Sequence, residues 1–143
     1  MKKIIGIFIV CVIIILSLFY GYFTYKKNNK SILKQNAEYE NYLNKEVYGA
    51  ELATVMNKVI DSNKENLVDR DNKGKYIENN TNSIKMDIKI IDNNTVYDVE
   101  TIYNGGIENF VKNFNIIKFK CTQIKYHENT KRVKYLLFEQ ITK

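Results

Sequence analysis

The sequence of 143 residues contains no proline and no tryptophan, and it has one histidine, two cysteines and six glycines. A disulfide framework is excluded, because Cys11 lies in a long apolar run while Cys121 lies in a predicted strand outside it. The glycines form no glycine-rich phosphate loop. Around His127, which neighbours Glu128 in a predicted turn, there is neither metal-ligand spacing nor the set of partners for a Ser or Cys triad. We therefore interpret His127 as a solvated turn residue.

The residues that are present suffice for one folded domain. With 45% hydrophobic and 13% aromatic residues, the chain can bury enough apolar surface to fold. Its length allows one domain once an N-terminal hydrophobic segment is set aside. The abundance of lysine, asparagine, isoleucine and tyrosine is typical of an AT-rich bacterial genome.

The most informative segment runs from Ile4 to Tyr25, which is 22 residues without a charged side chain. At about 1.5 Å per residue, such a helix matches the roughly 30 Å hydrocarbon core of a bilayer. The run is longer than the apolar region of a signal peptide, and it ends in aromatic residues without a small-residue cleavage pattern. After a basic tail of residues 1–3, we therefore predict an uncleaved transmembrane anchor. Its membrane-contacting residues include Ile4, Ile9, Ile14, Leu18, Tyr20, Tyr22 and Tyr25.

Two signals disagree on the side of the membrane that carries the rest of the chain. Two lysines precede the apolar run, whereas Lys26, Lys27, Lys30 and Lys34 follow it, and an excess of lysine marks the cytoplasmic side. Against that count, an external N-terminus requires a tail with two lysines and the amino group to cross the bilayer. We expect a single-pass cell-membrane protein with an extracytoplasmic soluble part, and the cytoplasmic arrangement is the alternative.

The first part of the soluble region has helical periodicity. Residues 26–48 are predicted to form a juxtamembrane helix or stalk, and residues 49–143 a small soluble domain. Apolar residues recur at helical spacing from Ser31 to about Asn63, and no proline intervenes, so the membrane helix is expected to continue into this amphipathic one. Gly49 lies inside the pattern, where it allows a kink or the close approach of another backbone.

Strict alternation then predicts strands. The segment 83–90 alternates apolar and polar residues, and after a turn at 92–94 a second alternation runs from Tyr97 to Tyr103, so the two predict an antiparallel hairpin. Gly105 and Gly106 end it, and the spacing from Ile107 to Phe114 predicts a short helix.

Two further strands follow this helix. The apolar phase changes within residues 117–126, which predicts a bulge near Thr122 and Gln123. Residues 133–138 are apolar on both faces near their end, which predicts a central closing strand. The fold class is α+β: an N-terminal transmembrane helix that continues into an amphipathic helix packed on a small antiparallel sheet of about four strands.

The sequence predicts no catalytic residue, no metal site and no cofactor. Asp69 and Asp71 begin a pattern similar to a calcium loop, but Lys73 stands where an oxygen ligand is needed, so we interpret the segment as a turn. Asp98 and Glu100 are expected to share a solvent-facing strand face. A lone cysteine in a strand, Cys121, is expected to be a small buried residue.

Basic residues gather in the last third of the chain, interleaved with Tyr126 and Tyr135. Such a pattern can bind a single-stranded nucleic acid, and an anionic membrane surface or wall polymer would satisfy the same charges. The alternative is a solvated sheet face. The residues of this candidate anionic-ligand surface are Lys118, Lys120, Lys125, Lys131, Arg132 and Lys134.

The order of basic leader, apolar helix, amphipathic helix and antiparallel sheet resembles the type IV pilin and pseudopilin architecture. Lys2, Lys3 and Gly6 match a short basic leader that ends in glycine before the apolar run. Cys11 stands where the family has a glutamate at the fifth mature position. The resemblance implies that the apolar helix packs between subunits and that the domain is displayed outside.

The sequence therefore predicts a non-catalytic, membrane-anchored interaction or assembly module at the cell surface. Its expected partners are the lipid bilayer and either further copies of itself or other surface proteins, and no small-molecule substrate is evident. The alternative is a cytoplasm-facing module that binds nucleic acid or anionic lipid through the basic strands.

Overall fold

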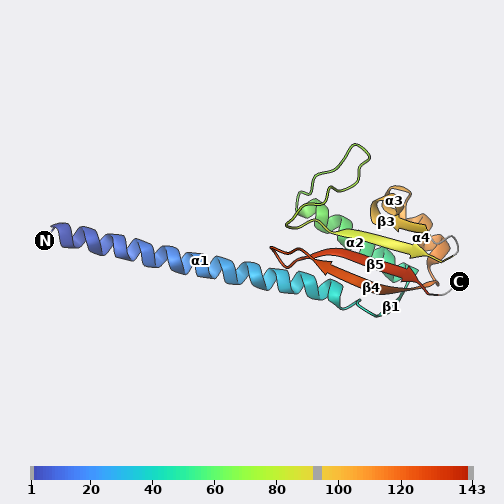
Figure 1. Cartoon of the computed structure of the whole chain (residues 1–143), viewed down its shortest axis with the longest axis horizontal. Coiled ribbons are helices and arrows are strands. Elements are labelled where there is room, and N and C mark those ends of the chain that lie inside the picture. The colour runs from blue at the N-terminus through green and yellow to red at the C-terminus, as the bar shows by residue number, and fades with distance from the viewer. Residues whose placement is uncertain (1, 92–94, 142–143) are drawn as a thin grey trace. The chain divides into compact units, whose positions relative to one another are not determined.

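A computed structural model describes residues 2–91 and 95–141 of the chain, with side chains from Ile4 onward. The chain divides into two compact units, Met1–Gln35 and Asn36–Lys143. The first unit is helical, and the second is an α+β domain, as the alternating and helical patterns predict. The elements are α1 (Lys2–Glu40), β1 (Glu46–Tyr48), α2 (Gly49–Glu65), β2 (Lys85–Ile90), β3 (Thr95–Asp98), α3 (Val99–Asn104), α4 (Ile107–Phe114), β4 (Lys118–Tyr126) and β5 (Val133–Gln140) (Figure 1).

The helix α1 is long and apolar enough to cross a membrane. Its apolar side chains lie on all sides of the helix, and those of the predicted anchor are exposed, from 51% to 77% between Ile15 and Tyr20. A helix that is apolar all round is stable in water only when it is buried, so these side chains need a cover that the described chain does not provide.

The apolar helix continues past Tyr25 as predicted, but the predicted helical stretch from Ser31 to about Asn63 is interrupted, because α1 ends at Glu40 and α2 begins at Gly49. Between them the chain turns at Asn44, whose positive φ of 60° asparagine tolerates, and its N–H donates to the carbonyl of Cys121 at 2.8 Å. The short strand β1 then pairs with β4. The expected close approach is found at Gly49 itself, since a Cβ there would lie 2.0 Å from the carbonyl oxygen of Phe114.

The sheet is mixed, so the prediction of a purely antiparallel sheet is wrong. In the described residues it has the strand order β1-β4-β5-β2-β3, with β2 and β5 parallel and the other pairs antiparallel. Alternation sets which side chains share a face but carries no information on strand direction. The predicted central position of β5 is confirmed, and the predicted bulge is confirmed by a register shift between Cys121 and Gln123.

The second arm of the predicted hairpin is shorter than expected. β3 ends at Asp98, whose side chain accepts a hydrogen bond of 2.8 Å from the N–H of Thr101, and this cap starts α3 at Val99. The strand prediction from Val99 to Tyr103 is therefore wrong. The predicted helix from Ile107 to Phe114 is confirmed as α4.

The hydrophobic core lies between the sheet and the helices. In Figure 1, α2 lies behind the strands, and α2 contacts α3, α4, β2 and β4. The helix sends Leu52, Val55, Met56, Val59 and Ile60 into the core, all at most 1% exposed, as their helical spacing requires. The opposite face of the sheet carries alternating charged residues from β1, β4, β5 and β2, which are exposed or half-buried except for the buried Asp87.

Candidate functional site

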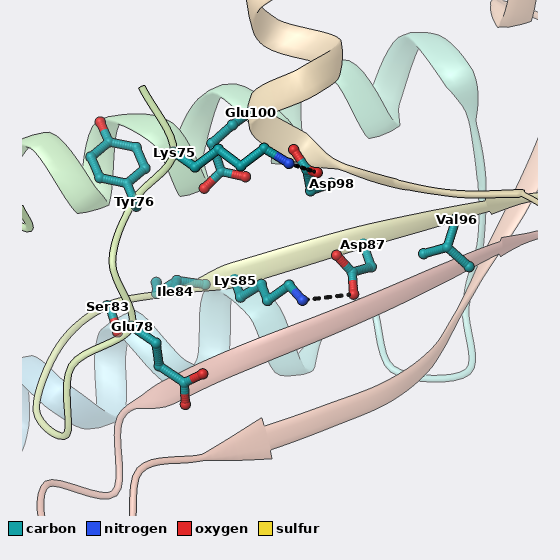
Figure 2. Close-up of a pocket in the computed structure, with 10 residues that line it drawn as sticks. All are labelled: Lys75, Tyr76, Glu78, Ser83, Ile84, Lys85, Asp87, Val96, Asp98 and Glu100. Carbon is teal, nitrogen blue, oxygen red and sulfur yellow. Dashed lines mark hydrogen bonds and ion pairs between the residues drawn. The ribbon is translucent and has the colours of Figure 1, made fainter. Parts of the chain in front are cut away.

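The domain has a polar hollow, a slot of about 290 Å³ beside β2. Its walls come from the segment 75–78, the start of β2, the end of β3 and the start of α3, as Figure 2 shows. We call it the charged slot. Its lining residues are Lys75, Tyr76, Glu78, Ser83, Ile84, Lys85, Asp87, Val96, Asp98 and Glu100.

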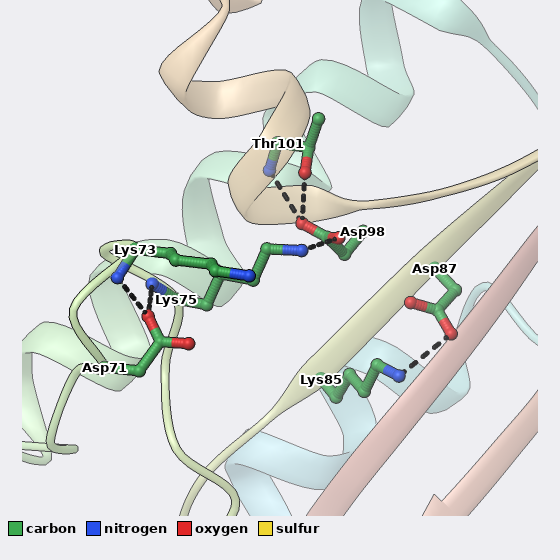
Figure 3. Close-up of polar contacts among 7 residues, drawn as sticks. All are labelled: Asp71, Lys73, Lys75, Lys85, Asp87, Asp98 and Thr101. Atoms are coloured by element: carbon green, nitrogen blue, oxygen red, sulfur yellow. Dashed lines mark hydrogen bonds and ion pairs between the residues drawn. The ribbon is translucent and has the colours of Figure 1, made fainter.

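A tight turn at residues 71–75 positions one wall of the charged slot. The Oδ1 atom of Asp71 accepts hydrogen bonds from the backbone N–H groups of Lys73 and Lys75, at 2.8 and 2.9 Å (Figure 3). Gly74 has a φ of +77°, which glycine adopts without strain. The N–H of Lys75 is the main cause that holds the pKa of Asp71 below its ordinary value. The predicted turn is confirmed, and the Asp71 carboxylate supports the backbone of that turn.

Asp98 links the turn segment that contains Lys75 to the start of α3. Its Oδ2 accepts a hydrogen bond from Nζ of Lys75 at 2.6 Å, while its Oδ1 accepts from the N–H and the hydroxyl of Thr101 (Figure 3). Burial by itself would raise the pKa of Asp98, but these hydrogen bonds outweigh it and lower the pKa. Asp98 is therefore held as an anion between the turn segment and α3.

Glu100 behaves in the opposite way. It is 6% exposed, and burial raises its pKa, although the backbone of Glu100 itself and that of Tyr76 act to lower it. The prediction that Asp98 and Glu100 share a solvent-facing strand face is wrong, because the chain is helical from Val99 and turns Glu100 inward. The sequence held one signal for this, since Asp98 is a residue type favoured at helix N-caps.

A second polar network lies on β2 and β5. Oδ2 of Asp87 lies 3.4 Å from Nζ of Lys85 and accepts a hydrogen bond of 3.1 Å from the hydroxyl of Tyr135. Burial, followed by the nearby Asp87 carboxylate, raises the pKa of Tyr135 to about 12. Asp87 is thus paired with a cation and a neutral donor at the floor of the charged slot (Figure 2).

The charged slot has an excess of acidic groups, with four carboxylates against the ammonium groups of Lys75 and Lys85. Glu78 contributes the fourth carboxylate, and it lies 3.7 Å from Nζ of Lys134. Such a slot favours a cationic group over an anionic one. Among residues 2–91 and 95–141, no group of three or more His, Cys, Asp or Glu side chains is arranged to hold a metal ion.

The candidate anionic-ligand surface is spread over three elements. Lys118, Lys120 and Lys125 lie on β4, Lys131 and Arg132 in the following turn, and Lys134 on β5. Nζ of Lys118 lies 3.1 Å from Glu46, and Nη1 of Arg132 lies 3.2 Å from the side-chain oxygen of Asn66. In the strand register Lys120 lies opposite both Glu46 and Glu139. Carboxylates therefore lie among these cations.

Two residues of chemical interest are buried in the domain. The prediction that His127 is solvated is wrong: it is 2% exposed, and its Nε2 lies 2.8 Å from the carbonyl oxygen of Ser83, which ties the β4–β5 turn to the start of β2. Cys121 is fully buried as predicted, and burial raises the pKa of its thiol to about 11. The thiol is therefore protonated at neutral pH.

Comparisons of the chain with protein-family models, with curated proteins and with solved structures gave no match.

Proposed function

We propose that this protein is a single-pass membrane-anchored interaction module whose α+β domain is displayed on the extracytoplasmic side and acts without catalysis. One observation carries the proposal. The apolar side chains from Ile4 to Tyr25 are exposed around the whole circumference of α1, while the domain buries its apolar residues in a core of its own. A bilayer would cover the exposed apolar side chains of the first unit, whereas the second unit can present its polar surface to water.

The surface chemistry of the domain supports an interaction role. The charged slot and the uncovered face of the sheet together present carboxylates and lysines on the strands and on the segments beside them. Rigidly placed charges of both signs select a partner by electrostatic complementarity. We propose another protein as the partner, with a cationic side chain at the charged slot.

The extracytoplasmic side is proposed from the two lysines before the apolar run. If Lys2 and Lys3 stay in the cytoplasm, they lie on the side where positive charge is normally found. The lysines that follow Tyr25 favour the other side by count, so orientation is the step to measure first.

Topology mapping with single cysteines tests the proposal in intact cells. In a background with Cys11→Ser and Cys121→Ala, the variant Asn129→Cys is exposed to a membrane-impermeant thiol reagent. We expect labelling without lysis. A matched variant, Ile9→Cys, lies in the proposed span and is expected to react only after detergent is added.

The opposite results redirect the proposal. Labelling of Asn129→Cys only after lysis would place the domain in the cytoplasm, and binding of nucleic acid or anionic lipid by the basic strands would replace the surface role. Recovery of the chain in the soluble fraction would refute the anchor. If the domain is external, the mass of the mature N-terminus tests the pilin-like interpretation, which requires cleavage after Gly6.

A further inference from the structure

The lysines that follow the apolar part of α1 lie on one face of the helix. Lys26, Lys27, Lys30 and Lys34 are all exposed, and at about 100° per residue they fall within an arc of about 100°. We call these four residues the lysine band. Because α1 is one continuous helix from Lys2 to Glu40, the band is a fixed extension of the apolar segment.

Three of the four residues of the lysine band have no acidic neighbour along the helix. The first carboxylate of the sequence is Glu38, so positions 1–37 contain cations and no anion. On a helix, charges compensate each other between residues three or four apart, and no such pair exists for Lys26, Lys27 or Lys30. The positive charge of this segment is therefore available to an anion from outside the chain.

The distance of the lysine band from the apolar segment indicates which anion it can bind. At about 1.5 Å per residue, Lys26, Lys27 and Lys30 lie roughly 1.5, 3 and 7.5 Å along the axis beyond Tyr25. All three are within about 8 Å, the screening length at physiological salt, whereas Lys34, at roughly 13.5 Å, lies beyond it. The aromatic residues before the band, Tyr22, Phe23 and Tyr25, suit the interface itself. The cations therefore lie at the depth of lipid phosphates.

We propose that the lysine band binds the headgroups of anionic phospholipids in the leaflet from which α1 emerges. The inference rests on the anchor of the proposed function but not on its orientation, because either topology brings the same residues to a headgroup layer. Lys26, Lys27 and Lys30 contact phosphate directly, and Lys34 adds a weaker, salt-sensitive attraction.

Lipid selectivity of the full chain tests this inference. The protein is reconstituted into phosphatidylcholine vesicles that contain a trace of spin-labelled phosphatidylglycerol or spin-labelled phosphatidylcholine, and the motionally restricted fraction of each label is measured. Since a lysine near an anionic surface contributes about 1 kcal/mol, we expect phosphatidylglycerol to be preferred by about threefold or more. The preference should weaken as salt is raised from 0.05 to about 1 M, where the screening length falls to about 3 Å.

Matched variants locate the site. Replacing the four residues of the lysine band with glutamine should bring the preference close to one, and an equal change in the domain, Lys118, Lys120, Lys125 and Lys134 to glutamine, should leave it unchanged. Helicity and co-flotation with vesicles confirm that each variant is folded and inserted.

Three results would overturn the inference. They are equal restriction of the two lipids by the unaltered chain, a preference that persists in 1 M salt, and loss of the preference in the domain variant alone. Failure of the unaltered chain to float with vesicles is a different result, because it refutes the anchor and with it the proposed function.

Discussion

The lysines of α1 and the lysines of the sheet differ in what lies beside them. In the lysine band, Lys26, Lys27 and Lys30 have no carboxylate three or four residues away along the helix. In the sheet, Nζ of Lys89 lies 3.1 Å from Glu139, and Lys118 lies at the same distance from Glu46. The formal net charge of +6 therefore describes the whole chain but neither surface. A basic cluster in sequence becomes a basic surface only when the fold keeps anions away from it.

The same contrast applies to apolar residues. Phe19 in α1 is 58% exposed, whereas Phe119 in β4 is fully buried and its ring lies 5.9 Å from that of Phe110 and 6.1 Å from that of Phe114. A phenylalanine in the first region depends on its surroundings outside the chain, and one in the second depends on its neighbours in the fold. Substitutions matched between the regions can therefore separate anchoring from folding.

The largest effect is expected from Phe119→Ala. Removing a fully buried ring from the core should destabilise the domain by about 3–5 kcal/mol, because the contacts with Phe110 and Phe114 are lost and a cavity remains. Denaturant titration of the full chain in detergent, followed by near-UV circular dichroism, measures the loss. Phe19→Ala is the control and should leave the domain midpoint unchanged. A similar loss in both variants would show that α1 and the domain unfold together.

A smaller and pH-dependent effect is expected from Glu100→Gln. Burial raises the pKa of Glu100 in the folded domain, so the unfolded chain ionises first. The contribution of Glu100 to stability is then complete below its ordinary value of 4.5 and is lost as the pH rises through the raised pKa. The neutral variant avoids this loss and should melt about 2–5 °C higher at pH 7, with little difference near pH 4.

Melting curves from pH 4 to 8 check this prediction. The exposed Glu108→Gln is the matched control on α4 and should follow the unaltered protein at every pH. A Glu100 variant that is less stable at pH 7 would mean that the backbone of Tyr76 and of Glu100 stabilises the negative charge by more than burial opposes it. Asp98, whose pKa is lowered, works in the opposite sense: its contribution is present above its ordinary value of 3.8 and is lost as the pH falls through the lowered pKa.

The parts of the fold that were predictable are those whose side chains repeat. Residues 85–90 alternate strictly, and β2 has these bounds; the stripe of α4 is similarly clear. The bulge was predictable because a strand that buries one face cannot change phase without an extra residue, and the phase changes at Thr122 and Gln123. In each case the pattern is local, so a single stretch of sequence contains the whole signal.

The missed features depend on contacts between distant residues. The parallel pairing of β2 with β5 is set by the path of the chain through α3, α4 and β4. His127 is buried because the turn that holds it packs against Ser83, 44 residues earlier. The charged slot needs the turn at Asp71 to bring Lys75 to Asp98, 23 residues away. No periodicity reports such contacts, and only the helix cap at Asp98 had a local signal.

The smallest effect is expected from the sheet's own ion pairs, and it tests the contrast between the two sets of lysines directly. Lys89 and Glu139 lie on neighbouring parallel strands at 3.1 Å and are 41% and 31% exposed in their side chains. A double-mutant cycle with Lys89→Gln and Glu139→Gln should give a coupling of about 0.5 kcal/mol, because water screens a half-exposed pair and ordering two side chains costs entropy.

The control cycle pairs Lys30→Gln with the same Glu139→Gln and should give no coupling beyond error. A coupling above about 2 kcal/mol for Lys89 would mean that the sheet face is drier than its exposure indicates, as it would be if another surface covered it. A value near zero would mean that the pairing of lysines with acids on this face sets its charge but not its stability, which is the property expected of a surface that meets a partner by electrostatic complementarity.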